Sequence, residues 1–266
     1  MVDEADPRPD ESRIEVVIVP GGPRQVLLQA ALNGGREHPA MPTTAAELAR
    51  EARGAVDAGA RVLHLHPVDT NGRETLAAQS CAEALRAVRA ACPGIPISLT
   101  TSAGIQPDPR RRLEQVAAWT VLPELVTANQ GERGIVELCE MLIARGVGIE
   151  AGLLSTADAE AFVASGLADR CVRVLIEPLD GDPDAAVAHA DAMEEIVTAA
   201  GIHLEQVHHG DGIASWAVNR RGLERGHGIR TGLEDTPVLP DGTPAPDNAA
   251  LVRAAAAMIT TAGQAP

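Results

Sequence analysis

Short apolar runs alternate along this chain with longer alanine-rich stretches whose apolar residues recur at helical spacing. This alternation is typical of a parallel sheet built from repeated β-α units. Strands are predicted at 26–33, 61–66, 97–101, 124–129, 147–151, 171–177, 204–209 and 228–234. Helices are predicted at 44–58, 75–91, 109–119, 132–145, 156–165, 183–200, 214–225 and 246–262. Eight strands that are each followed by a helix predict an α/β protein with a single (β/α)8 TIM barrel.

Residues typical of helix ends support several of these boundaries. Thr44 is followed three positions later by Glu47, and Ser155 is followed by Asp158, which is the spacing of a helix N-cap. Glycines stand where helices are expected to stop, because glycine adopts the left-handed conformation of a helix C-terminus. These glycines are Gly59, Gly146, Gly166 and Gly201.

No linker interrupts the β-α series, so we expect residues 26–266 to form one catalytic barrel domain. Residues 1–12 are acidic, contain two prolines and lack the basic start and apolar stretch of a signal peptide. We therefore expect residues 1–25 to begin with an acidic disordered lead-in. Either a short ribbon formed by 15–19 and 25–28 or a plug near 20–23 is expected to follow it.

Composition and charge narrow the class of partner. The chain has 266 residues, of which 45% are hydrophobic and 22% charged, as in a globular protein. No apolar run approaches the roughly 20 residues that cross a bilayer, so no membrane span is expected. A net charge of -15 argues against a nucleic-acid partner, because phosphate binding depends on clustered basic residues. Small molecules are the expected ligands.

Missing residue types exclude several mechanisms. All 22 basic residues are arginine, and the chain contains neither lysine nor tyrosine. Lysine Schiff bases, P-loop chemistry and tyrosine catalysis are therefore excluded. The four cysteines show no C-x-x-C spacing, so we expect buried thiols in a reducing compartment, the cytoplasm.

The barrel prediction indicates where a site should lie, because barrel enzymes place their active sites at the C-terminal ends of the strands. Those ends are unusually polar in this chain. They carry Asn33, His64, His66, Thr100, Thr101, Thr127, Asn129, Glu150, Glu177, His208, His209, Glu234 and Asp235.

His64 and His66 are two positions apart on a predicted strand, so both side chains face the barrel interior. A His-x-His pair with one carboxylate is a common open zinc site. Glu234 ends the eighth predicted strand, which lies close to the second once the barrel has closed. We predict that these three residues hold a metal. The alternative is a pair of hydrogen-bonded histidines without a metal.

Arg230 precedes Glu234 by four residues and is expected on the same strand face, with Asp235 next to the metal. An aspartate held there by arginine could act as a general base. A purely structural Arg230–Asp235 ion pair is the alternative. His208 and His209 could also supply ligands, although consecutive strand residues point to opposite faces.

Four separated motifs occur together in one order. They are His-Leu-His at 64–66, Thr-Thr-Ser-Ala-Gly at 100–104, Pro-Glu-Leu-Val-Thr at 123–127 and Arg-Thr-Gly-Leu-Glu-Asp at 230–235. Ala-Gly-Ala-Arg at 58–61 and Asn248 accompany them. Over residues 26–262 the chain resembles the β-keto acid cleavage enzymes, which include 3-keto-5-aminohexanoate cleavage enzyme.

The resemblance implies a zinc-dependent barrel that exchanges an acyl unit between a β-keto acid and acetyl-CoA, giving acetoacetate and a new acyl-CoA. It also implies a homo-oligomer, a homotetramer. It makes His64, His66 and Glu234 the zinc ligands and Asp235 the base, paired with Arg230. It assigns substrate contacts to Thr100, Thr101, Thr127 and Glu150. Backbone amides of the turn at 101–104 are expected to help orient the substrate carboxylate.

The chain departs from the family pattern around the substrate. Thr-Thr-Ser-Ala at 100–103 stands where members carry Ser-Thr-Gly-Gly. Arg36 replaces an acidic residue, with Glu37 one position later, and the glycine-rich end of the seventh strand is His-His-Gly-Asp-Gly at 208–212. These differences leave the metal centre intact, so the reaction class is better supported than any particular keto acid.

Two other functions use the same barrel. A metal-dependent amide or ester hydrolase would use the same ligands to activate water. A non-catalytic barrel that binds a metal or a metabolite would be stabilised by its ligand without turnover.

Overall fold

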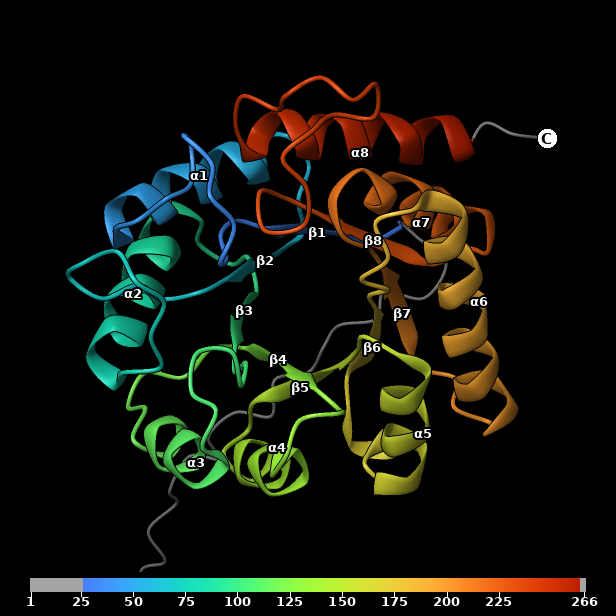
Figure 1. The fold of residues 1–266 in the computed structure, drawn as a ribbon. Coiled ribbons are helices and arrows are strands. Elements are labelled where there is room, and N and C mark those ends of the chain that lie inside the picture. The colour runs from blue at the N-terminus through green and yellow to red at the C-terminus, as the bar shows by residue number, and fades with distance from the viewer. Residues whose placement is uncertain (1–25, 264–266) are drawn as a thin grey trace, which may run out of the picture.

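Eight parallel strands close into a barrel in the computed structural model, which describes residues 26–263 (Figure 1). Each strand pairs with the next in chain order, and the eighth pairs with the first. The strands are β1 Leu28–Ala31, β2 Val62–Leu65, β3 Ile97–Thr100, β4 Leu125–Asn129, β5 Gly148–Leu153, β6 Arg173–Ile176, β7 Glu205–His208 and β8 Gly228–Thr231. The predicted (β/α)8 TIM barrel is confirmed. Residues 15–19 of the expected ribbon and the alternative plug near 20–23 lie outside the described residues.

Within residues 26–263, eight α-helices form a ring around the strands (Figure 1). They are α1 Ala45–Asp57, α2 Ala78–Ala91, α3 Pro109–Ala117, α4 Ile135–Ala144, α5 Thr156–Ser165, α6 Pro183–Ala199, α7 Ser215–Glu224 and α8 Asn248–Ala262. Thr44 and Ser155 accept hydrogen bonds from the backbone amides of Glu47 and Asp158, as the spacing predicts. Gly166 ends α5 in the left-handed conformation with φ +69°.

Two helices, α2 and α4, begin three residues later than predicted. Before α2, the backbone between Pro67 and Thr75 forms a small hairpin in which the Thr75 amide donates to the Pro67 carbonyl at 2.8 Å. Before α4, Gly134 adopts a left-handed φ of 73°, which delays the helix to Ile135. Both differences arise from turn conformations that helical periodicity does not encode.

The two faces of the strands differ in polarity. Leu63 and Leu65 of β2 are fully buried in the apolar layer between strands and helices. The interior of the barrel is polar instead, because Gln29 of β1 donates hydrogen bonds across it to both carboxylate oxygens of Glu150 on β5, at 3.1 and 3.2 Å. Arg173 of β6 also faces Glu150, at 3.6 Å. These polar groups form a floor beneath the mouth of the barrel.

The four cysteines form no disulfide within residues 26–263, and all four are buried, as expected. They are Cys81, Cys92, Cys139 and Cys171. No helix in the same described range has both the length and the apolar character that a membrane span requires.

A candidate metal and catalytic site at the barrel mouth

His64 and His66 reach the barrel mouth from β2 and from the residue just after it. His64 pairs in register with Ala31 of β1 and Ser98 of β3, and its side chain is buried. His66 follows two positions later, so the alternation of the strand carries both rings to the same side. The predicted shared orientation of the two histidines is confirmed by their common neighbour, Glu234.

Glu234 comes from a turn rather than from a strand, so the predicted extension of the eighth strand to 234 is wrong. The strand ends at Thr231, and the Asp235 and Thr236 amides then donate to the Gly232 carbonyl at 3.0 and 2.9 Å. Glycine is required at 232, because a Cβ there would lie 1.8 Å from the Ala31 carbonyl oxygen. The turn nevertheless carries Glu234 to the histidines.

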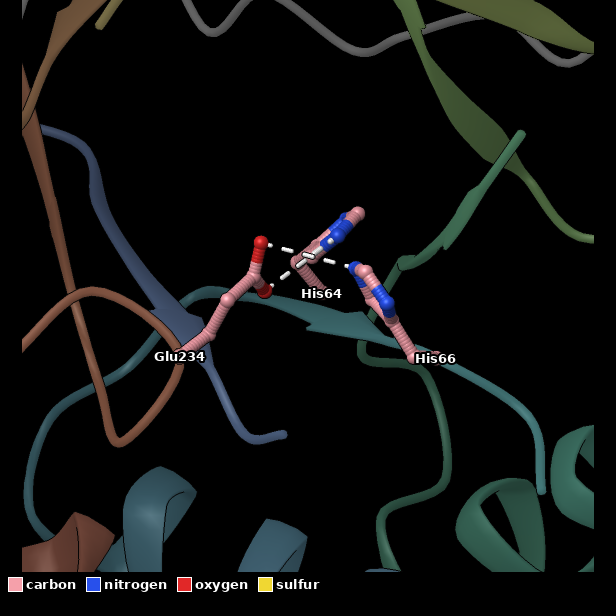
Figure 2. A group of neighbouring side chains, drawn as sticks. All are labelled: His64, His66 and Glu234. Atoms are coloured by element: carbon pink, nitrogen blue, oxygen red, sulfur yellow. Dashed lines mark ion pairs between the residues drawn. The ribbon is translucent and has the colours of Figure 1, made fainter. Parts of the chain in front are cut away.

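The three side chains converge, as Figure 2 shows. The Nε2 atom of His64 lies 3.4 Å from Oε2 of Glu234, and Nε2 of His66 lies 3.5 Å from Oε1. Ligand atoms of a tetrahedral zinc ion bound at about 2.0–2.1 Å stand about 3.4 Å apart. The Oε2 atom of Glu234 is buried and has no hydrogen-bond partner among the described residues. This donor set and its orphaned oxygen fit a divalent metal such as zinc.

The two histidines differ in their affinity for a proton. Burial lowers the pKa of His64 to about 3, so its ring is neutral and able to coordinate a metal. Burial also opposes protonation of His66, but the carboxylates of Glu234 and Glu74 outweigh it and raise the pKa to about 9. The carboxylates thus hold a positive charge at His66. A metal cation would replace that proton, because only a neutral imidazole coordinates.

Arg230 connects the candidate ligand to the candidate base. Its Nη2 atom donates to Oε1 of Glu234 and to Oδ1 of Asp235, at 2.7 Å each, and its Nε atom lies 3.2 Å from both oxygens of Asp235. Both Arg230 and Asp235 are buried. Burial alone would raise the pKa of Asp235, but Arg230 and then His209 outweigh it and lower the pKa. Asp235 is therefore held as a carboxylate, the form that a general base requires.

His209 is a further member of the mouth. Its Nδ1 atom lies 3.5 Å from Asp235 and its Nε2 atom 3.6 Å from Glu177, and neither nitrogen has a hydrogen-bond partner in residues 26–263. Burial raises the pKa of Glu177. His208 points the other way, where Arg221 of α7 donates to it. The alternation of β7 therefore assigns the two histidines, left open by the sequence, to opposite faces.

Thr100 ends β3, Thr101 follows it, and Thr127 lies in the middle of β4, paired in register with Thr100; all three are buried. The hydroxyl of Thr127 lies 3.2 Å from Nδ1 of His64 and 3.4 Å from Glu150, so it stands beneath the metal ligands. Thr101 donates its hydroxyl proton to the Thr127 carbonyl at 2.8 Å. Glu150 is fully buried in the barrel floor.

The turn after β3 does not offer the amides that the sequence led us to expect. The Ser102 amide donates to the Thr100 hydroxyl at 3.2 Å, and the Ala103 amide donates to Glu132 at 2.9 Å. The Gly104 amide donates to the Ser102 hydroxyl at 3.0 Å. Because these three amides already have acceptors, they are not free to bind a substrate carboxylate.

Two positions where the chain departs from the family pattern contact each other. Arg36, in the loop after β1, donates to the Asp211 carboxylate at 2.5 Å. It also donates to the carbonyls of Glu234 and Asp235, at 3.3 Å each. Arg36 and Asp211 therefore clamp the turn that carries the candidate ligand and base. Because the two residues are far apart in the chain, only their opposite charges could have indicated this contact.

Comparison with known sequences supports the resemblance to the β-keto acid cleavage enzymes. Two curated proteins named 3-keto-5-aminohexanoate cleavage enzyme, from Fusobacterium nucleatum subsp. nucleatum and Acetoanaerobium sticklandii, are each 32% identical to this chain over 111 residues. The matched segment covers 40% of this chain and 40% of each relative. The match therefore spans less than half the length of these relatives.

Among solved structures, the apo structure of ObcA superposes on this chain with a TM-score of 0.70 at 17% identity. The match covers 85% of this chain and 63% of ObcA, and at this identity it shows the fold alone. Other ObcA structures are a binary complex with oxaloacetate and a ternary complex with a C4-CoA adduct and oxalate.

A match to a family model extends over the whole length of the barrel. The model of the beta-keto acid cleavage enzymes matches residues 25–266, which include the whole described barrel and every residue of the candidate site. The chain belongs to the beta-keto acid cleavage enzyme family.

Proposed function

We propose that this protein is a zinc-dependent enzyme that condenses a β-keto acid with acetyl-CoA and releases acetoacetate and a new acyl-CoA. The observation that carries the proposal is the convergence of two buried imidazoles and Glu234 beside an arginine-held Asp235. Family membership supports cleavage of a β-keto acid. The CoA adduct and oxaloacetate bound to the similarly folded ObcA support this class of substrates.

His64, His66 and Glu234 would hold the zinc ion, with coordination positions left for substrate. When bound, zinc supplies Lewis acidity that makes the carbon between the ketone and the carboxylate easier to deprotonate. Gly34 keeps space above Glu234, because a Cβ at this position would lie 2.7 Å from Cγ of Glu234.

Asp235 removes a proton from that carbon, and Arg230 holds the carboxylate in place through its hydrogen bonds. The carbanion attacks the acetyl carbonyl of acetyl-CoA, a carbon–carbon bond forms, and the CoA thiolate leaves. The thiolate then attacks the original ketone, and the bond to the central carbon breaks to give the acyl-CoA. Asp235 returns its proton to the acetoacetate carbanion. No step of this sequence requires a lysine, which the chain lacks.

Thr100, at the end of β3, and Thr127, its neighbour on β4, are proposed to orient the substrate carboxylate. Thr101 and Glu150 would act with them, since Thr101 bonds to the Thr127 carbonyl and Glu150 faces the Thr127 hydroxyl. Their burial keeps bulk water away from this side of the reacting carbon.

The experiment is a panel of β-keto acids incubated with acetyl-CoA and the zinc-loaded protein, scored for acetoacetate and for new acyl-CoA. The proposal expects both products in equal amounts from at least one acid. Turnover of an ester or amide in water without a thioester would instead identify a hydrolase. Stabilisation by a ligand without any turnover would identify a non-catalytic binding protein.

We also propose that the enzyme works in the cytoplasm, where its four buried thiols would stay reduced. By family resemblance we propose a homotetramer. Light scattering coupled to size exclusion measures the mass directly, and a monomer would contradict this part of the proposal.

A further inference from the structure

The two candidate ligand histidines differ in what contacts their second ring nitrogen. Nδ1 of His64 lies 3.3 Å from the Ser98 hydroxyl and 3.2 Å from the Thr127 hydroxyl, which are neutral groups. Nδ1 of His66 instead makes a short hydrogen bond to the Glu74 carboxylate. Among the described residues, a carboxylate therefore contacts Nδ1 of His66, whereas only neutral hydroxyls contact Nδ1 of His64.

Glu74 reaches His66 because the chain folds back on itself after β2. Val68 and Glu74 form an antiparallel bridge, and the Asp69 amide donates to the Arg73 carbonyl at 2.7 Å. The Asp69 side chain accepts hydrogen bonds from the amides of Asn71 and Arg73, at 2.8 and 3.0 Å. This hairpin places a carboxylate eight residues after His66 directly against its ring.

The backbone of His66 is fixed from the opposite side by Asn33. The His66 amide donates to the Asn33 side-chain oxygen at 2.9 Å, and the Asn33 amide group donates to the His66 carbonyl at 2.8 Å. With its backbone held by Asn33 and its Nδ1 atom held by Glu74, the ring can present only Nε2 to Glu234. That nitrogen is the one 3.5 Å from the Glu234 carboxylate.

We propose that Glu74 is a positioning residue for the metal site, which fixes the ring orientation and tautomer of His66 and strengthens it as a ligand. This inference rests on the metal site of the proposed function. Carboxylates that accept the second N–H of a ligating histidine orient its ring and raise its basicity, and their loss typically costs 10–100-fold in metal affinity. The hairpin between Pro67 and Thr75 is thus part of the metal site.

The test is the affinity for zinc, measured by competition with a chromophoric chelator on the full-length protein. Glu74→Ala should weaken zinc binding by about 10–100-fold. Glu74→Gln should weaken it less, because its amide oxygen still accepts the hydrogen bond but carries no charge. Arg73→Gln is the matched control, since Arg73 lies in the same hairpin, is largely exposed and pairs with Asp69. It should bind zinc as the wild type does.

A second measurement separates positioning from a general effect on stability. With cobalt in place of zinc and at saturating metal, Glu74→Ala should change the visible absorption spectrum, whereas Arg73→Gln should not. Metal-free Glu74→Ala should still unfold in one cooperative thermal transition, which excludes loss of the fold as the cause of weaker zinc binding. Wild-type zinc affinity and an unchanged cobalt spectrum in both Glu74 variants would overturn the role of Glu74 but not the metal site itself. A wild-type protein that binds no zinc would overturn the metal site and this inference together.

Discussion

Two clusters of histidine, arginine and carboxylate lie on opposite faces of the barrel wall. The mouth cluster contains His64, His66, His209, Glu177, Arg230, Glu234 and Asp235. The outer cluster contains His208, His227, Glu194, Arg221 and Asp191, where β7 meets α6 and α7. Both clusters contain three groups close enough to hold a metal ion, so residue types alone do not distinguish them.

Hydrogen bonding distinguishes the two clusters. In the outer cluster, Nε2 of His208 lies 3.0 Å from the Gln206 side-chain oxygen, and Nδ1 accepts from Arg221 at 3.1 Å. His227 stacks on His208 with ring centres 4.8 Å apart and contacts Glu194 at 3.1 Å. The outer cluster is a satisfied structural network that ties helices to the barrel.

The mouth cluster is not satisfied in this way. One buried oxygen of Glu234 and both ring nitrogens of His209 have no hydrogen-bond partner among the described residues. Leaving buried polar atoms without partners costs about 1–3 kcal/mol for each group. The proposed functional cluster therefore differs from the outer one in that its groups converge while several of their buried atoms lack hydrogen-bond partners among the described residues.

The largest effect is expected at the proposed base. Asp235→Asn keeps the shape of the side chain but cannot take a proton, so exchange of the substrate α-protons with deuterated solvent should fall by about 10²–10⁴-fold. Zinc content should not change. Asp191→Asn is the control in the outer cluster and should exchange protons at the wild-type rate. Undiminished exchange in Asp235→Asn would remove this residue from its role.

A smaller effect is expected when the planar fork of arginine is lost at the mouth. Arg230→Lys retains the charge but not the parallel hydrogen bonds to Asp235, so kcat should fall by about 10²-fold with zinc retained. Arg221→Lys in the outer cluster should leave kcat unchanged and lower the melting temperature. If Arg230→Lys instead unfolds or loses its zinc while its folded fraction turns over normally, Arg230 is only a structural ion-pair partner.

The smallest effect concerns pH and the outer cluster. Burial, together with His227 and Arg221, keeps the pKa of His208 well below its usual 6.5. Below pH 6.5 the unfolded chain therefore binds a proton that the folded chain does not, and stability falls as pH falls, by about 1.4 kcal/mol per unit. His208→Gln should remove this share of the slope in denaturant titrations between pH 7 and 5. An identical slope in both proteins would contradict the assignment.

Local patterns explain how much of this molecule could be predicted from the sequence. Strand and helix periodicity gave the eight β-α units, and the alternation of a strand placed His64 and His66 together. The expected end of the eighth strand indicated Glu234, Asp235 and Arg230, and the family motif agreed with this assignment. The structure then brought these residues together, although through a turn at Gly232 rather than along a longer strand.

Contacts between loops could not be predicted in the same way. Glu74 reaches His66 only through the geometry of a hairpin, and Arg36 meets Asp211 only because the barrel closes. His209 could be predicted only as a polar residue at the end of a strand, because its neighbours depend on the register between adjacent strands. Such contacts depend on turn conformation and on distant pairing, neither of which has a period in the sequence.

The zinc content of a matched pair of histidine variants shows directly whether the mouth cluster, and not the outer cluster, holds the metal. Wild-type protein, His66→Ala and His208→Ala are loaded with zinc, freed of excess metal by gel filtration and assayed for zinc per chain. We expect about one zinc per chain in the wild type and in His208→Ala, and little in His66→Ala, because the proposed zinc site lies in the mouth cluster alone. Full zinc content in His66→Ala would contradict a zinc site at the barrel mouth. So would a loss of zinc in His208→Ala with none in His66→Ala.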